Sequence, residues 1–133
     1  LGVPLLWSLH FSILFIWFGL LVLGLSYLLS GIPVNHIWHL LTIGGMGGLI
    51  LAMISRVSLG HTGRPLMPPK VMNVAFFMIS LAALIRAFGP WLLPEQSLMF
   101  IDTSMLCWLI AYGIFTVKYG PMLMAPRADN RPG

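Results

Sequence analysis

The chain has 133 residues, of which 59% are hydrophobic and 8% are charged, and its formal net charge is +4. A soluble domain carries roughly 25% charged residues, so this composition excludes a water-exposed globule and indicates a membrane protein. The basic residues flank apolar runs and form no tract that could follow a phosphate backbone, which excludes nucleic acid as a partner.

Four apolar runs reach the length of about 20 residues that a membrane-spanning helix needs. The sequence therefore predicts an all-α polytopic membrane protein with one transmembrane region over residues 1–133. The runs lack the alternation of a membrane barrel, and none shows the interruption expected at the midplane site of a transporter. The predicted spans are 5–29, 37–59, 71–91 and 98–119, followed by a tail over 120–133.

The first span contains His10, about 8 Å from the start of the helix at 1.5 Å per residue. An ionisable group inside a membrane is a candidate functional residue. His10 is either a ligand of a metal or haem, or a histidine that hydrogen-bonds a neighbouring helix. Gly31 and Pro33 then end the span, and Asn35 is a plausible N-cap for the next helix.

The second span opens with His39, which has His36 one turn earlier on the same face. Such a pair can face one metal ion or one haem edge, but histidine is also ordinary near a membrane boundary. Gly44 and Gly48 follow in a GxxxG pattern, which predicts close approach either of a helix or of a flat cofactor.

The connection "SRVSLGHTGRPLMPPK" concentrates positive charge between the second and third spans. Gly60 and Gly63 are expected in left-handed turns on either side of His61, which is either solvated or close to a ligand. Because basic residues favour the cytoplasmic side, this connection and the tail are predicted to lie inside the cell. The residues that set this orientation are Arg56, Arg64, Lys70, Lys118, Arg127 and Arg131.

The third span contains Arg86 and the fourth contains Asp102, at a similar depth in the antiparallel hairpin. Isolated charges are costly in hydrocarbon, so the two are predicted to form a structural ion pair. The alternative is that Arg86 holds a haem propionate or another anion. Cys107 is read as a small packing residue.

The histidines differ in expected depth: His10 and His61 belong near the inner face, and His39 belongs near the outer face. One metal ion is therefore not expected to bind all three, and two sites are the simpler arrangement. No nucleotide-binding loop, zinc-protease motif or pair of catalytic carboxylates is present, and the prediction leans away from an enzyme.

The stretch "HLLTIGGMGGLILAMISRVSLGHTGRPL" resembles the NnrS family of bacterial membrane proteins, with its histidine, glycine-rich stretch and GHTGRP ending. "LWSLHFS" is similar to the family's preceding helix. The tail "PRADNRPG" resembles the family ending "PRxDGRPG", with Asn130 in place of glycine. The residues that match the central motif are His39, Gly44, Gly47, Arg56, Gly60, His61, Thr62, Gly63, Arg64, Pro65 and Leu66.

The resemblance implies a protein of the inner membrane that binds haem and copper and acts in denitrification or in relief of nitrosative stress. It implies about a dozen helices, so we expect this chain, whose first residue is Leu1, to be a fragment with upstream helices as its partners, and we do not expect its first apolar run to be a signal peptide. It also makes His10, His39 and His61 the candidate metal and haem ligands, with Arg56 and Arg64 as anion partners. Nitric oxide is the implied ligand.

The sequence is compatible with three functions. The first is a haem- and copper-binding protein of the NnrS type, with His10 as the first choice for the axial ligand. The second is a transporter of a small solute or a metal complex, in which Arg86 and Asp102 line the path. The third is a scaffold or assembly partner without a cofactor.

Overall fold

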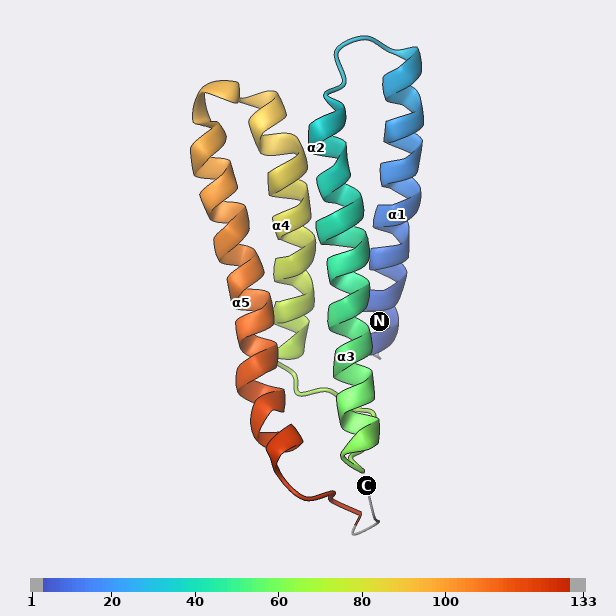
Figure 1. Cartoon of the computed structure of the whole chain (residues 1–133), viewed down its shortest axis with the longest axis vertical. Helices are drawn as coiled ribbons and strands as arrows, with labels where there is room; N and C mark the ends of the chain where they lie inside the picture. The colour runs from blue at the N-terminus through green and yellow to red at the C-terminus, as the bar shows by residue number, and fades with distance from the viewer. Residues whose placement is uncertain (1–3, 130–133) are drawn as a thin grey trace.

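Four antiparallel helical spans make up the computed structural model, which describes residues 4–129 (Figure 1). The first span is α1 (Pro4–Leu28). The second joins α2 (Val34–His39), the π-helix η1 (Leu40–Gly47) and α3 (Gly48–His61) end to end. The third is α4 (Met72–Leu92), and the fourth is α5 (Ser97–Met124), preceded by the short 3-10 helix η2 (Pro94–Gln96). All four are long and apolar enough to cross a membrane, which confirms the predicted all-α membrane fold.

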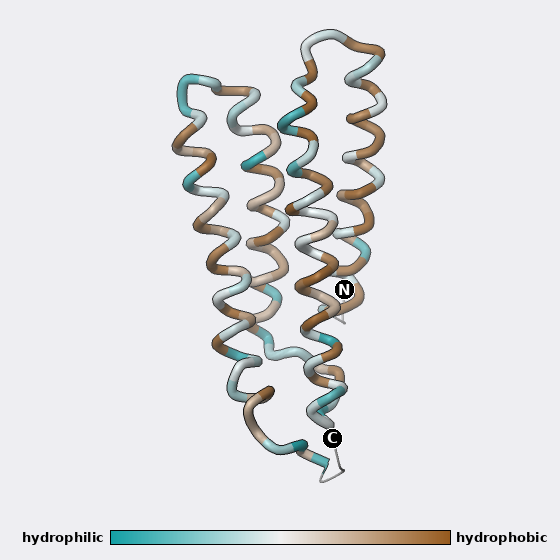
Figure 2. The backbone as a smooth tube through the Cα atoms, in the orientation of Figure 1, coloured by the Kyte–Doolittle hydropathy of each residue, from teal (hydrophilic) through white to brown (hydrophobic). Residues whose placement is uncertain are grey.

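Hydrophobic residues cover the spans, and hydrophilic positions collect mainly in the connections at the two ends of the bundle (Figure 2). Large apolar side chains such as Leu14, Trp17, Leu109 and Val117 are more than half exposed. In water such a surface would drive aggregation, whereas lipid tails solvate it and leave the backbone to satisfy its own hydrogen bonds in the helices.

The second span and α4 form the centre of the bundle, because 44% of the residues in each apolar window are buried, against 11% in α1 and 17% in the fourth span. Two buried clusters hold these elements together, one toward each end of the spans. The cluster on the side of the 62–71 connection includes Leu5, Leu51, Ala52, Leu59, Met72, Ala75, Phe76, Ile79, Ala111 and Tyr119. The other includes Phe15, Leu40, Ala83 and Ala87.

The glycine-rich stretch packs against protein and not against a flat cofactor. A Cβ atom on Gly44 would lie 2.6 Å from the ring of Phe15 and 3.0 Å from Ala83, and one on Gly45 would lie 2.7 Å from Ile16. A Cβ on Gly48 would collide with Ser12. The absence of these side chains lets α1 approach the second span closely, which settles the two readings of the GxxxG pattern in favour of helix packing.

Within residues 4–129 no span is broken, as expected, but the second span, one continuous helix over Val34–His61, is wound as a π-helix over Leu40–Gly47. Hydropathy does not report winding, so the apolar run concealed the change. The widened turns coincide with the three glycines of the segment, which have no side chain to resist a change of winding. Segments of π-helix are rare and often lie at functional sites.

The second span also begins earlier than predicted, and Asn35 is not its N-cap. The helix starts at Val34, and Pro33 takes the cap position without any side-chain hydrogen bond. The carbonyl of Pro33 already accepts the amide of His36 at 3.1 Å, so helical hydrogen bonding starts before the Asn35 side chain could initiate it.

The fourth span is longer than predicted, because α5 continues past Tyr119 to Met124 with Pro121 inside it. Met122 packs against the buried cluster, and its carbonyl accepts a hydrogen bond from Arg64 Nη1 at 3.5 Å. These contacts stabilise a last turn that the proline alone would weaken. The predicted tail thus starts as helix, and its last four residues, 130–133, which include Asn130 and Arg131, lie outside the described part of the chain.

One of the two predicted left-handed glycines is correct. Gly63 has a φ of 68°, whereas Gly60 belongs to α3, which ends only at His61. The helix continues because the amides of Thr62 and Gly63 still bond back to Ser58 and Gly60, each at 3.1 Å.

Candidate functional site

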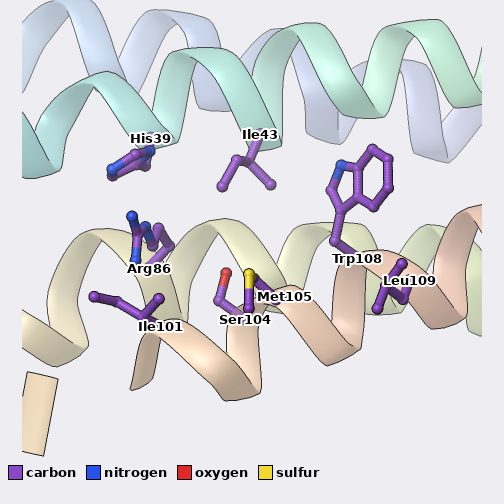
Figure 3. A pocket seen from close by; sticks show the side chains of 8 residues that line it. All are labelled: His39, Ile43, Arg86, Ile101, Ser104, Met105, Trp108 and Leu109. Carbon is purple, nitrogen blue, oxygen red and sulfur yellow. The ribbon is translucent and has the colours of Figure 1, made fainter. Parts of the chain in front are cut away.

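A hollow lies between the second span, α4 and α5, on the side of the bundle where α2 begins (Figure 3). Its volume is about 440 Å³, which falls in the range of small-molecule sites. We call it the His39–Arg86 pocket, after its two ionisable side chains. Its walls are His39, Ile43, Arg86, Ile101, Ser104, Met105, Trp108 and Leu109.

Three elements position these walls. His39 is the last residue of α2 and lies directly before the π-helix, so its ring is held where the winding of the span changes. Arg86 extends from α4 toward it across the hollow (Figure 3). The remaining wall is one face of α5, because residues 101, 104, 105, 108 and 109 repeat at helical spacing. Sequence reasoning missed this face, although its spacing was readable from the chain.

The charge in the pocket belongs to Arg86 and has no protein partner. Arg86 Nη1 is buried and makes no hydrogen bond. Leaving such a donor unpaired costs about 1–3 kcal/mol, and more for a charged group. An anionic or strongly accepting group in the pocket would remove that cost.

The predicted ion pair between Arg86 and Asp102 is wrong. Among residues 4–129 the structure contains one salt bridge, Arg127–Asp129. Asp102 is exposed, because it lies about 160° around α5 from the buried Ser104 at roughly 100° per residue. Arg86 and Asp102 lie at a similar depth, but the position of Asp102 around the axis of α5 turns its carboxylate away from Arg86.

Hydrogen bonds and ring contacts fix the α5 wall. The Ser104 hydroxyl donates to the carbonyl of Ala82 at 2.9 Å, which ties α5 to α4. The Trp108 ring lies against Tyr112 with centroids 4.4 Å apart. The Tyr112 hydroxyl in turn donates to the carbonyl of Gly47, the last residue of the π-helix, at 3.0 Å. The pocket is thus built on the same contacts that anchor the π-helix.

His10 does not reach this pocket. The residues of α1 that are buried are Leu5, Ser8, Ser12, Phe15 and Gly19, and His10 lies on the opposite, exposed face. Its Nδ1–H donates to the carbonyl of Leu6 at 2.7 Å, which leaves Nε2 directed away from the backbone. The residue that was first choice as axial ligand is therefore on the outside of the described bundle.

His61 lies at the other end of the second span, in a shallow groove of about 370 Å³. Arg56 shares this groove, whereas Arg64 is half-buried and donates to the carbonyl of Met122. No group of three His, Cys, Asp or Glu side chains with metal-binding spacing occurs within residues 4–129. Among the described residues, His10, His39 and His61 thus occupy three separate places, and of the three only His39 shares a hollow with a guanidinium nitrogen that is both buried and unpartnered.

The chain matches a family model described as "NnrS protein" over residues 1–127. No curated protein matches it significantly. No solved structure does either.

Proposed function

The chain belongs to the NnrS family, and from this premise we propose that it contributes a haem site to a membrane protein that handles nitric oxide or responds to nitrosative stress. His39 is the proposed iron ligand, and Arg86 is the proposed partner of a haem propionate. The observation that carries the proposal is the unpartnered Nη1 of Arg86 in the same hollow as His39.

The residues of the pocket are chemically suited to haem. A neutral imidazole is a common axial ligand, and a guanidinium binds a carboxylate with charge-assisted hydrogen bonds. The other walls are an aromatic ring, a thioether, aliphatic side chains and Ser104, whose hydroxyl is already bonded to the carbonyl of Ala82, so they suit a flat apolar group. Bound haem would supply an iron centre with affinity for nitric oxide, and the chain would orient it and set its surroundings.

Residues 4–129 contain no comparable set of donor side chains for copper. His36 and His39 lie one turn apart in α2, His10 and His61 lie elsewhere, and within residues 4–129 no third His, Cys, Asp or Glu joins any pair of them. His10 and His61 remain proposed ligands, with Arg56 and Arg64 as proposed anion partners, only together with donors from outside residues 4–129.

The haem content of the purified full-length protein tests the proposal. We expect His39→Ala to lower the ratio of haem to protein by at least several-fold. His36→Ala is the matched control, because His36 lies one turn earlier on the same helix and does not line the pocket. Equal haem content in both variants would remove His39 from the site.

Transport of a small solute is the second candidate, and the π-helix beside the hollow that holds the unpartnered Arg86 favours it. Local π-helical winding often lies at functional sites, and an intramembrane charge facing a hollow is typical of a solute path. Uptake into proteoliposomes would separate the two functions. Uptake that persists in protein stripped of haem supports transport, and haem-bound protein without uptake supports the first proposal.

We further propose that the membrane is the bacterial inner membrane and that the 62–71 connection faces the cytoplasm. The support is charge: Arg64 and Lys70 lie in this connection and Lys118 and Arg127 near the C-terminus, whereas the opposite connections contain no Lys or Arg.

A further inference from the structure

Two motifs that the haem proposal does not use meet at the end of α3. The amide of Ala128, in "PRAD", donates to the carbonyl of Thr62, in "GHTGRP", at 2.9 Å. A Cβ atom on Gly63 would lie 2.6 Å from the carboxylate carbon of Asp129. Only glycine fits there, with its φ of 68° and the carboxylate against it. Ala128 and Asp129 of the C-terminal segment therefore pack against the end of the second span.

This contact places Arg127 beside α3. Arg127 donates from Nε and Nη2 to the two carboxylate oxygens of Asp129, at 2.9 and 2.7 Å. The hydrogen bonds raise the pKa of Arg127, so its guanidinium stays cationic. Its third nitrogen, Nη1, takes no part in this pair and is available to another acceptor.

The groove at this end has a cationic part and an apolar part. Its walls are Met53, Arg56, Val57, Gly60, His61, Leu66 and Arg127. Arg56 has no carboxylate partner in the described chain, since the salt bridge found there joins Arg127 and Asp129. The other two acidic residues, Glu95 and Asp102, lie toward the opposite end of the bundle. The cationic part therefore carries an excess of positive charge.

The apolar part extends further from the helix end than the cationic part. Along α3, Met53 lies about one turn further from the helix end than Arg56, Val57 lies next to Arg56, and His61 is the last residue of the helix. Met53 and Val57 are 48% and 46% exposed. The groove is open above Gly60, where a Cβ would find its nearest neighbour, Leu66, at 3.9 Å. A soluble anion would use only the cationic part, whereas a phospholipid matches both, with its phosphate at the arginines and its acyl chain along Met53 and Val57.

We propose that this groove binds an anionic phospholipid, with Arg56 and Arg127 on the headgroup phosphate. The proposal is independent of the haem site, which lies at the other end of the second span. Each arginine near an anionic membrane surface contributes about 1 kcal/mol, which corresponds to roughly five-fold in affinity.

Native mass spectrometry of the full-length protein in neutral detergent tests the proposal, with phosphatidylglycerol and phosphatidylcholine titrated separately. We expect phosphatidylglycerol to bind more tightly than phosphatidylcholine. Arg56→Gln and Arg127→Gln should each lower phosphatidylglycerol binding about five-fold and leave phosphatidylcholine binding unchanged. Lys118→Gln is the matched control, because it removes one charge at the same end of the bundle but lines a different groove.

The outcomes separate specific from general attraction. Loss of phosphatidylglycerol binding in the two arginine variants, with Lys118→Gln unaffected, supports the site. An equal loss in Lys118→Gln overturns it, because membrane charge in general would then explain the binding. Full displacement of the lipid by millimolar inorganic phosphate would also overturn it, since the apolar part would contribute nothing. Arg56→Gln keeps the test decisive if Arg127→Gln disturbs the C-terminal segment.

Discussion

Arg86 is the residue whose surroundings demand the most explanation. Its buried Nη1 has no acceptor, and the carboxylate expected beside it, on Asp102, faces away. A protein retains such a cost when a ligand offsets it, which is why intramembrane charges mark functional sites. In the proposed site the offset comes from a propionate, so Arg86 should destabilise the haem-free protein and stabilise the loaded one.

Arg86→Met tests this reasoning directly, because methionine keeps much of the side-chain length and removes the charge. We expect thermal unfolding in detergent to show the haem-free variant more stable than the haem-free wild type by about 1–3 kcal/mol. The same variant should retain less haem. Lys118→Met is the control, because Lys118 is exposed and should change neither quantity. A loss of stability without haem would instead indicate that Arg86 has a structural partner.

Sequence reasoning identified the important side chains but not their directions. His39 and Arg86 stood out as ionisable groups in apolar runs, and an anion partner for Arg86 was one of its two readings. Depth alone could not distinguish an anionic ligand of Arg86 from an ion pair with Asp102. A difference of two residues along α5 turns a side chain by about 200° without much change in depth. The same limit applied to His10, whose depth was readable but whose face was not.

At the scale of elements, the close contact of α1 with the second span depends on glycine. Gly44→Ala would place a methyl group against Phe15 and Ala83, and neither a ring carbon nor a helix-bound Cβ can move away cheaply. We expect a loss of about 1–3 kcal/mol in stability, measured by thermal unfolding in detergent.

Gly24→Ala provides the matched control for that experiment. Gly24 is also helical, in α1, and a Cβ there would meet nothing within 4 Å. The stability of the Gly24→Ala variant should stay unchanged or rise by up to about 1 kcal/mol, because alanine is a better helix former than glycine. Similar losses in both variants would contradict the packing explanation, because a methyl group at Gly24 meets no neighbour.

The π-helix has its own anchor in Tyr112. Tyr112→Phe removes the hydrogen bond to the carbonyl of Gly47 and leaves the ring against Trp108. Hydrogen bonds between spans average about 0.6 kcal/mol, so we expect a loss of that order in unfolding experiments. Thr116→Val is the control, because the Thr116 hydroxyl bonds only within α5, to the carbonyl of Tyr112. A larger loss in the control would contradict an anchoring role.

Hydropathy was sufficient to predict the four spans, because length and composition are what a bilayer selects. It could not predict the π-helix or the extra turn of α5, because both depend on contacts between spans. Pro121 illustrates the point: local chemistry favours a helix end there, and packing of Met122 with the hydrogen bond from Arg64 overrides it.

At the scale of the whole molecule, the distribution of positive charge predicts the orientation. Met67→Cys and Gln96→Cys place thiols in connections at opposite ends of the bundle, and both positions are exposed. The natural Cys107 is buried within α5. In intact cells with a permeable outer envelope, we expect a membrane-impermeant maleimide to label Gln96→Cys and not Met67→Cys until the cells are lysed. The reverse pattern would invert the proposed topology.

The assembled bundle separates two chemical environments, a pocket with His39 and Arg86 at one end and a cationic groove at the other. The central claim is that His39 binds haem iron, and a change of ligand tests it most directly. His39→Cys in the full-length protein should change the visible absorption and electron paramagnetic resonance of the haem from histidine-type to thiolate-type ligation, with His10→Cys and His61→Cys like the wild type. An unchanged spectrum in His39→Cys, with full haem content, would contradict the account.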